Sequence, residues 1–153
     1  MPSNLPSEPD TLTPDQTLDG AVEYETMLFF RRRTTPGAAR AFVTDALAQW
    51  GQTERLDDIR LCASELATNA VLHGAPAGGR ILVRVELHAT VLCIEVHDSG
   101  NGTPTTREAR STTDDGRGLL LVSAVADHWG VSGRKGPGKC VWAAFHRSVL
   151  PAC

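Results

Sequence analysis

Glu65 and Asn69 stand four residues apart in the segment SELATNAVLHG, which has the apolar spacing of a helix. On a helix their side chains project from nearly the same face, one turn apart, and His73 continues this stripe. An asparagine oxygen is a neutral ligand for Mg²⁺ where phosphate and water fill the other positions. The neighbouring carboxylate is then free to take a proton from an attacking hydroxyl. The alternative interpretation is an exposed polar stripe.

Asp98 is a second candidate, at the end of the strand-patterned segment IEVHD. It is in phase with Ile94 and Val96, so its carboxylate is expected to face the core, where burial without a donor costs several kcal/mol. The exocyclic amine of adenine is a suitable donor, because an ionised aspartate only accepts hydrogen bonds. The alternative is that Asp98 caps its own turn through DSGNG.

Two glycine-rich segments favour contact between backbone and phosphate. Gly100, Asn101 and Gly102 follow Asp98, and glycine permits close backbone approach. Further on, Gly116-Arg117-Gly118-Leu119 is a glycine-rich entry to a helix that is expected to begin near residue 118. The first N–H groups of this helix would face an anion, and Arg117 could reach phosphate. The polar residues 103–115 are predicted to form a flexible loop or lid. Neither a P-loop nor a Rossmann glycine motif is present.

The other predicted elements have to position these residues. Their order predicts an α/β (α+β) two-layer sandwich, a mostly antiparallel five-stranded sheet covered on one face by three helices. Residues 1–22, rich in Pro, Ser, Thr and Asp, are predicted to be a disordered tail, and 23–149 the folded domain. The predicted strands are 24–33, 81–89, 91–98, 129–134 and 139–147, and the predicted helices are 36–50, 56–73 and 118–129.

Composition excludes several classes of protein. The chain of 153 residues carries a formal net charge of −3, which lacks the basic footprint of a nucleic-acid-binding protein. No apolar run is long enough for a membrane helix, and the N-terminus lacks a signal-peptide pattern, so a cytoplasmic protein is expected. The scattered cysteines Cys62, Cys93, Cys140 and Cys153 are predicted to be reduced structural thiols, not a metal site or disulfide framework.

The arginine run 31–33 ends the first predicted strand and leaves two interpretations open. One is a solvated strand end. The other is a surface that docks a partner or faces phosphate.

Taken together, the segment from Glu65 to His73, the DSGNG segment and the GRGL segment resemble the N box and the two glycine boxes of the histidine-kinase-like (GHKL, Bergerat-fold) ATPases. The best match is the branch of anti-sigma factor serine/threonine kinases, over about residues 25–147. The resemblance implies that Asn69 binds Mg²⁺, Glu65 is the general base, Asp98 binds the adenine amine of ATP, and residues 103–115 form an ATP lid.

The same resemblance implies a function and two partners. Members of this branch hold a sigma factor inactive and phosphorylate a small antagonist protein; dimers are usual among them. One departure concerns Cys140, which is expected at the place of a Thr or Ser that bonds the adenine region; losing one such bond costs about 1 kcal/mol. The alternatives are an ATP-binding regulator without kinase activity and a scaffold that binds no nucleotide.

Overall fold

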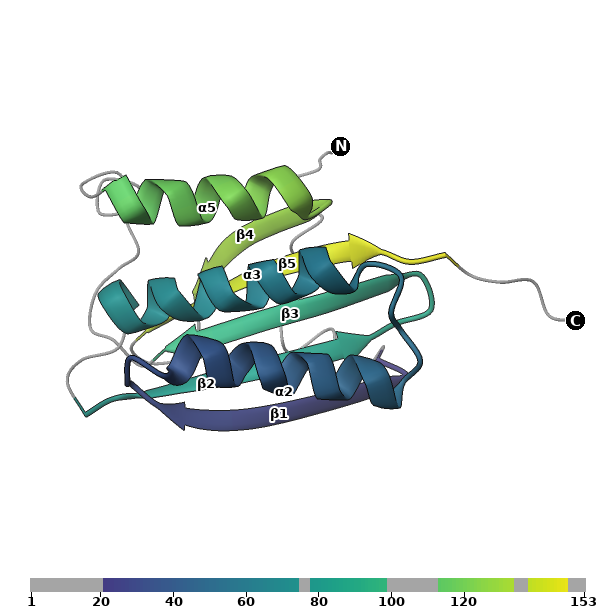
Figure 1. Cartoon of the computed structure of the whole chain (residues 1–153), viewed down its shortest axis with the longest axis horizontal. Helices are drawn as coiled ribbons and strands as arrows, with labels where there is room; N and C mark the ends of the chain where they lie inside the picture. Colours follow the sequence, from purple (N-terminus) through teal and green to yellow (C-terminus); the bar gives the residue numbers. More distant parts are fainter. Residues whose placement is uncertain (1–20, 75–77, 99–112, 134–137, 149–153) are drawn as a thin grey trace, which may run out of the picture.

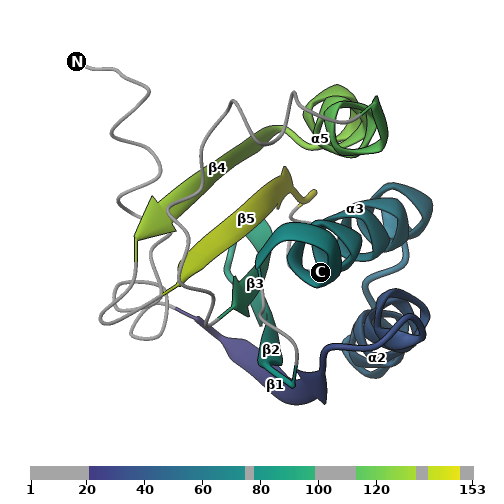
Figure 2. The same cartoon turned by 90° about the vertical axis from the view of Figure 1, so that its left-hand side faces the viewer.

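The structure is a computed structural model that describes residues 21–74, 78–98, 113–133 and 138–148, with the backbone alone for 113–118. A single five-stranded sheet has the order β1-β2-β3-β5-β4, with every neighbouring pair antiparallel. Three helices cover one face (Figures 1 and 2), which confirms the predicted two-layer α/β sandwich. In chain order the elements are β1 (Glu23–Phe30), α2 (Thr35–Gln49), α3 (Leu56–Asn69), the π-helical turn η2 (Ala70–Gly74), β2 (Arg80–Leu87), β3 (Val91–Asp98), α5 (Thr113–Val125), β4 (His128–Gly133) and β5 (Lys139–His146).

The core lies between the sheet and the helices. Alternate strand residues project toward the helices and are buried, as their period of two predicted. The helices contribute matching apolar stripes, and α3 buries the side that its spacing predicted. The buried core includes Ile59, Cys62, Leu66 and Ala70 from α3 and η2, Val43 and Leu47 from α2, and Ile81, Val83, Val85, Ile94, Val96, Val141, Ala143 and Phe145 from the strands.

The predicted boundaries of two elements, α5 and the first strand, were wrong. Helix α5 spans Thr113–Val125, five residues earlier at its start than the expected 118, and it ends before the predicted residue 129. Asp127 then lies between helix and strand, where its carboxylate accepts the backbone N–H of His146, and β4 begins at His128. The first strand ends at Phe30, so the arginine run follows it and is not part of it.

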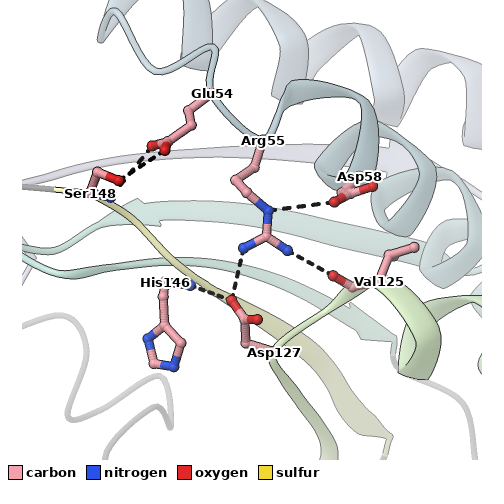
Figure 3. A network of polar contacts seen from close by, with 7 residues as sticks. All are labelled: Glu54, Arg55, Asp58, Val125, Asp127, His146 and Ser148. Atoms are coloured by element: carbon pink, nitrogen blue, oxygen red, sulfur yellow. Dashed lines mark hydrogen bonds and ion pairs between the residues drawn. The ribbon is translucent and has the colours of Figure 1, made fainter.

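A polar network joins the C-terminal end of α5 to α3 and β5 (Figure 3). The Arg55 guanidinium donates to the Asp127 carboxylate at 2.9 Å and to the Val125 carbonyl at 2.9 Å, and it also pairs with Asp58. Because the network satisfies a carbonyl of the last turn of α5, it stabilises this end of the helix. Within the described ranges, no helix is both long and apolar enough to cross a membrane.

Candidate functional site

Helix α3 carries Glu65 and Asn69 on one side, and both residues are half-buried. The helix then widens into the π-helical turn η2, which holds half-buried His73 and ends at buried Gly74. Single π-helical turns of this kind occur frequently at functional sites. Turn η2 contacts β3, the strand that ends at Asp98. The structure therefore connects the Glu65–Asn69 stripe to Asp98 through one short turn.

Arg31 holds this turn in place. Its Nε donates to the Val71 carbonyl at 2.7 Å, and its backbone N–H donates to the Gly79 carbonyl at 3.0 Å. Val71 lies within η2, where the widened helix leaves carbonyls that need donors. Of the two interpretations left open for the arginine run, neither describes Arg31, which supports the end of the N-box helix. Its sequence context gave no signal of that contact.

Asp98 lies on the helix-covered face at the end of β3 and is 1% exposed, as its phase with Ile94 and Val96 predicted. Its carboxylate is ion-paired: Oδ2 lies 3.1 Å from Nζ of Lys139, itself buried. The two residues face each other across neighbouring strands, since Asp98 of β3 is the register partner of Lys139 of β5. The alternative interpretation was that Asp98 caps its own turn in DSGNG. The residues of that turn after Asp98 lie outside the described ranges.

Gly74 is the third member of this arrangement. A Cβ atom placed on Gly74 would lie 2.2 Å from Oδ2 of Asp98 and 3.1 Å from Nζ of Lys139. The first distance is far below van der Waals contact, so only glycine lets the end of η2 approach the carboxylate this closely. The carboxylate is thus enclosed by helix backbone on one side and by a lysine on the other.

The expectation for Cys140 was wrong. Cys140 is the register partner of His97, so strand alternation turns its side chain to the face of the sheet that the helices do not cover. There it packs with Cys93, Trp142 and Ala144. The residue beside Asp98 is Lys139, and the predicted loss of one hydrogen bond at Cys140 does not apply. Lys139 was missed because the expected position on β5 was one residue too late. Neighbouring residues of a strand face opposite sides of the sheet, so a shift of one residue selects the wrong side chain.

The glycine segments are only partly described. Gly100, Asn101, Gly102 and the lid residues 103–112 lie outside the described ranges. Gly116, Arg117, Gly118 and Leu119 were expected to form the entry to a helix that begins near residue 118. They lie within the first two turns of α5, as do the last three residues of the predicted lid, 113–115. The packing of buried Val122 in the core accounts for a helix here despite two glycines, each of which costs about 1 kcal/mol relative to alanine.

These residues fit an adenine nucleotide with a magnesium ion. A buried carboxylate at a strand end supplies an acceptor for an amine, and Gly74 brings the backbone at the end of η2 close beside it. Asn69 is the residue of α3 whose neutral oxygen suits Mg²⁺, and Glu65 lies one helical turn away. The N-terminus of α5 adds backbone N–H groups of the kind that bind phosphate.

Comparisons with known proteins agree with this fold. A family model described as histidine kinase-like ATPase domain matches residues 32–145. The anti-sigma F factor of Clostridium acetobutylicum is 28% identical over 120 residues, which cover 72% of this chain and 84% of that protein.

Two solved structures share the architecture. The RsbU and RsbW domains of Rv1364c from Mycobacterium tuberculosis align with a TM-score of 0.61 and 19% identity, over 81% of this chain and 32% of that one. The histidine kinase domain of the blue-light activated histidine kinase from Erythrobacter litoralis EL346 aligns with a TM-score of 0.50 and 21% identity, over 72% of this chain and 60% of that one. This chain therefore spans about one third of the first structure, and at these identities the likeness establishes the fold alone. Because the family model spans most of the chain, this protein belongs to the histidine kinase-like ATPase family, and its relatives include an anti-sigma factor.

Proposed function

We propose that this protein is an ATP-binding anti-sigma regulator and a protein serine/threonine kinase. It would sequester a sigma factor and phosphorylate a small antagonist protein, which releases the sigma factor. The observation that carries the proposal is the connection from Glu65 and Asn69 on α3, through η2, to the buried Asp98 carboxylate. The likeness to an anti-sigma F factor supports the choice of branch. The folded unit would be 23–149, in the cytoplasm, as a monomer or a homodimer.

Each side chain has a proposed role. Asp98 accepts a hydrogen bond from the adenine amine, and Asn69 would hold Mg²⁺, which neutralises charge on the phosphates. Glu65 orients the substrate hydroxyl and takes its proton as the phosphoryl group is transferred. His73 continues the stripe toward the nucleotide. The backbone at Gly100, Asn101 and Gly102 and the free N–H groups in the first turn of α5, which includes Gly116, would face the phosphates, with Arg117 as a cation beside them.

Lys139 takes the base-reading place that Cys140 was expected to fill. A base edge that reaches Asp98 also meets the Lys139 ammonium, because the two groups are 3.1 Å apart. An ammonium group only donates hydrogen bonds, so Lys139 suits the ring acceptor N1 of adenine, adjacent to the amine that Asp98 reads. Asp98 and Lys139 would therefore match the amine and the neighbouring N1 on this edge of adenine.

A second function is favoured by the same ion pair. If a nucleotide has to displace Lys139 from Asp98 before a partner can bind, the protein would be a nucleotide-gated regulator without kinase activity. The burial of both charges supports this reading, because separating a buried ion pair costs several kcal/mol. The presence of Glu65 on α3 favours the kinase.

Transfer of labelled γ-phosphate to candidate antagonist proteins distinguishes the two functions. The kinase predicts a labelled serine or threonine with the wild-type chain and none with Glu65→Gln, while MgADP affinity stays within a few-fold. Asp57→Asn is the matched control, since Asp57 lies on the same helix and its side chain is 99% exposed. Binding of MgADP without labelling of any candidate would support the gated regulator. Full transfer by Glu65→Gln would rule out its role as the base.

A further inference from the structure

The face of the sheet that the helices do not cover carries a second cluster of reactive side chains. Glu95 and His97 are two residues apart on β3, so they share this face, and Cys140 of β5 is the register partner of His97. All three residues are buried. We call them the second-face cluster. It lies on the opposite side of the sheet from Asp98 and Lys139, so it is separate from the proposed nucleotide site.

The cluster brings three kinds of metal ligand together. One ligand atom from each residue, a carboxylate oxygen, an imidazole nitrogen and a thiol sulfur, lies within 4.8 Å of the other two. Glu95 Oε1 and His97 Nε2 are 3.0 Å apart. Tetrahedral zinc with bonds of 2.0–2.3 Å needs its ligand atoms about 3.3–3.7 Å from one another. The required adjustment is therefore about 1 Å, which side-chain rotation supplies without moving the strands.

Charge on this face favours a cation. Glu86 and Glu95 are both fully buried here, and Arg84 is a permanently charged group that faces them among the residues that the structure describes: it pairs with Glu86 and is the register partner of Glu95. His88 contacts Glu86, and His97 contacts Glu95. Burial raises the pKa of Glu95, while the hydrogen bond from His97 lowers it in part. Two buried carboxylates therefore lie side by side on this face next to Arg84, and a divalent ion bound at Glu95 would add positive charge to it.

We propose that Glu95, His97 and Cys140 form a zinc site. Zinc suits a mixed set of oxygen, nitrogen and sulfur ligands, whereas Mg²⁺ and Ca²⁺ prefer oxygen alone. A thiolate and a carboxylate neutralise the ion, and the thiol proton is released to solvent on binding. His97 has a side chain that is 9% exposed and lies nearest to solvent, so it gives the ion a route of entry. The site would link β3 to β5 behind the proposed nucleotide pocket.

Cobalt(II) titration of the metal-free full chain, without nucleotide, tests the site directly. The expected result is one ion bound per chain, with a near-ultraviolet thiolate-to-cobalt charge-transfer band that zinc abolishes by displacement. Cys140→Ser should remove the band and weaken zinc binding by about 100-fold or more. Even the loss of a residue that only hydrogen-bonds a metal ligand lowers metal affinity by about 10–100-fold. Cys93→Ser is the matched control: burial raises the pKa of Cys93 well above its usual value, and it lies on the same face outside the cluster.

Two further variants keep the test decisive if Cys140→Ser fails to fold. Glu95→Gln should weaken cobalt affinity at least tenfold and keep the charge-transfer band, because the thiolate remains a ligand. Asn69→Ala, which removes the proposed magnesium ligand, should leave cobalt binding unchanged. No band in the wild-type chain, a band that survives Cys140→Ser, or a band that disappears in Cys93→Ser would each overturn the proposal. None of these readouts depends on nucleotide binding, so the site and the proposed function can fail separately.

Discussion

The Asp98 carboxylate and the Lys139 ammonium form a buried ion pair at 3.1 Å, directly across neighbouring strands. Gly74 leaves room for it, since any side chain there would overlap the carboxylate. The pair places a donor beside the acceptor proposed to read adenine, so we expect it to affect both the stability of this end of the sheet and the proposed recognition of the base.

Removing the lysine alone should destabilise the protein. Lys139→Met leaves a buried carboxylate without its cation, which costs about 3–5 kcal/mol in the free energy of unfolding. Combining it with Asp98→Asn should recover most of that loss, because no buried charge remains. Urea denaturation of the single and double variants measures the coupling. Additive losses would contradict the ion pair.

Base recognition gives a sharper test of Lys139. If its ammonium donates to N1 of adenine, the wild-type chain should bind 1-deaza-ADP at least about tenfold more weakly than ADP, since a hydrogen bond to a charged group contributes about 1.5–3 kcal/mol. Lys139→Met should bind both nucleotides equally. Lys135→Met, at the only other lysine of the chain, should behave as wild type. Tighter ADP binding by Lys139→Met would instead indicate a lysine that blocks the site.

The close approach of Gly74 predicts a cost for the smallest side chain. Gly74→Ala would place Cβ 2.2 Å from Oδ2 of Asp98, so the carboxylate has to move and MgADP affinity should fall at least tenfold. Overpacking should also lower stability by about 1–3 kcal/mol. Gly133→Ala is the control, because its Cβ would meet nothing within 4 Å. Equal MgADP affinity for the two variants, measured by calorimetry, would exclude Gly74 from the site.

The Asp127 network predicts a pH dependence of stability. Burial alone would raise the pKa of Asp127, but the backbone N–H of His146 and the Arg55 guanidinium outweigh it, and the pKa is lowered. A carboxyl with a lowered pKa stabilises the fold above its unfolded pKa of about 3.9, and the contribution is lost as pH falls through the lower folded value. Wild type should therefore exceed Asp127→Asn in stability at pH 7 by about 1 kcal/mol. The difference should shrink below pH 4, and a constant difference in urea midpoints would contradict this account.

Much of the fold followed from periodicity. The alternation of β2 and β3 and the apolar stripe of α3 are strong patterns that tertiary packing reinforced, and both were predicted in the correct phase. The phase of β3 also placed Asp98 on the covered face. The start of α5 could not be predicted, because Gly116 and Gly118 disfavour a helix locally and the packing of Val122 overrides them.

The contacts that complete the site depend on long-range register, which the sequence does not display. Lys139 reaches Asp98 only through the pairing of β3 with β5, and a shift of one residue led to Cys140 instead. The contact of Arg31 with Val71 and the second-face cluster likewise join residues distant in the chain. Spacing along the sequence therefore predicted the residues of an N box but not the side chains that surround them.

Calorimetric titration with MgADP tests the central claim most directly. The wild-type chain should release or absorb heat with a saturable stoichiometry of one nucleotide per chain, and Asp98→Asn should weaken binding at least tenfold, because an amide replaces one carboxylate acceptor with a donor. No heat in the wild-type chain, or equal affinity in a folded Asp98→Asn variant, would contradict a nucleotide bound at this carboxylate.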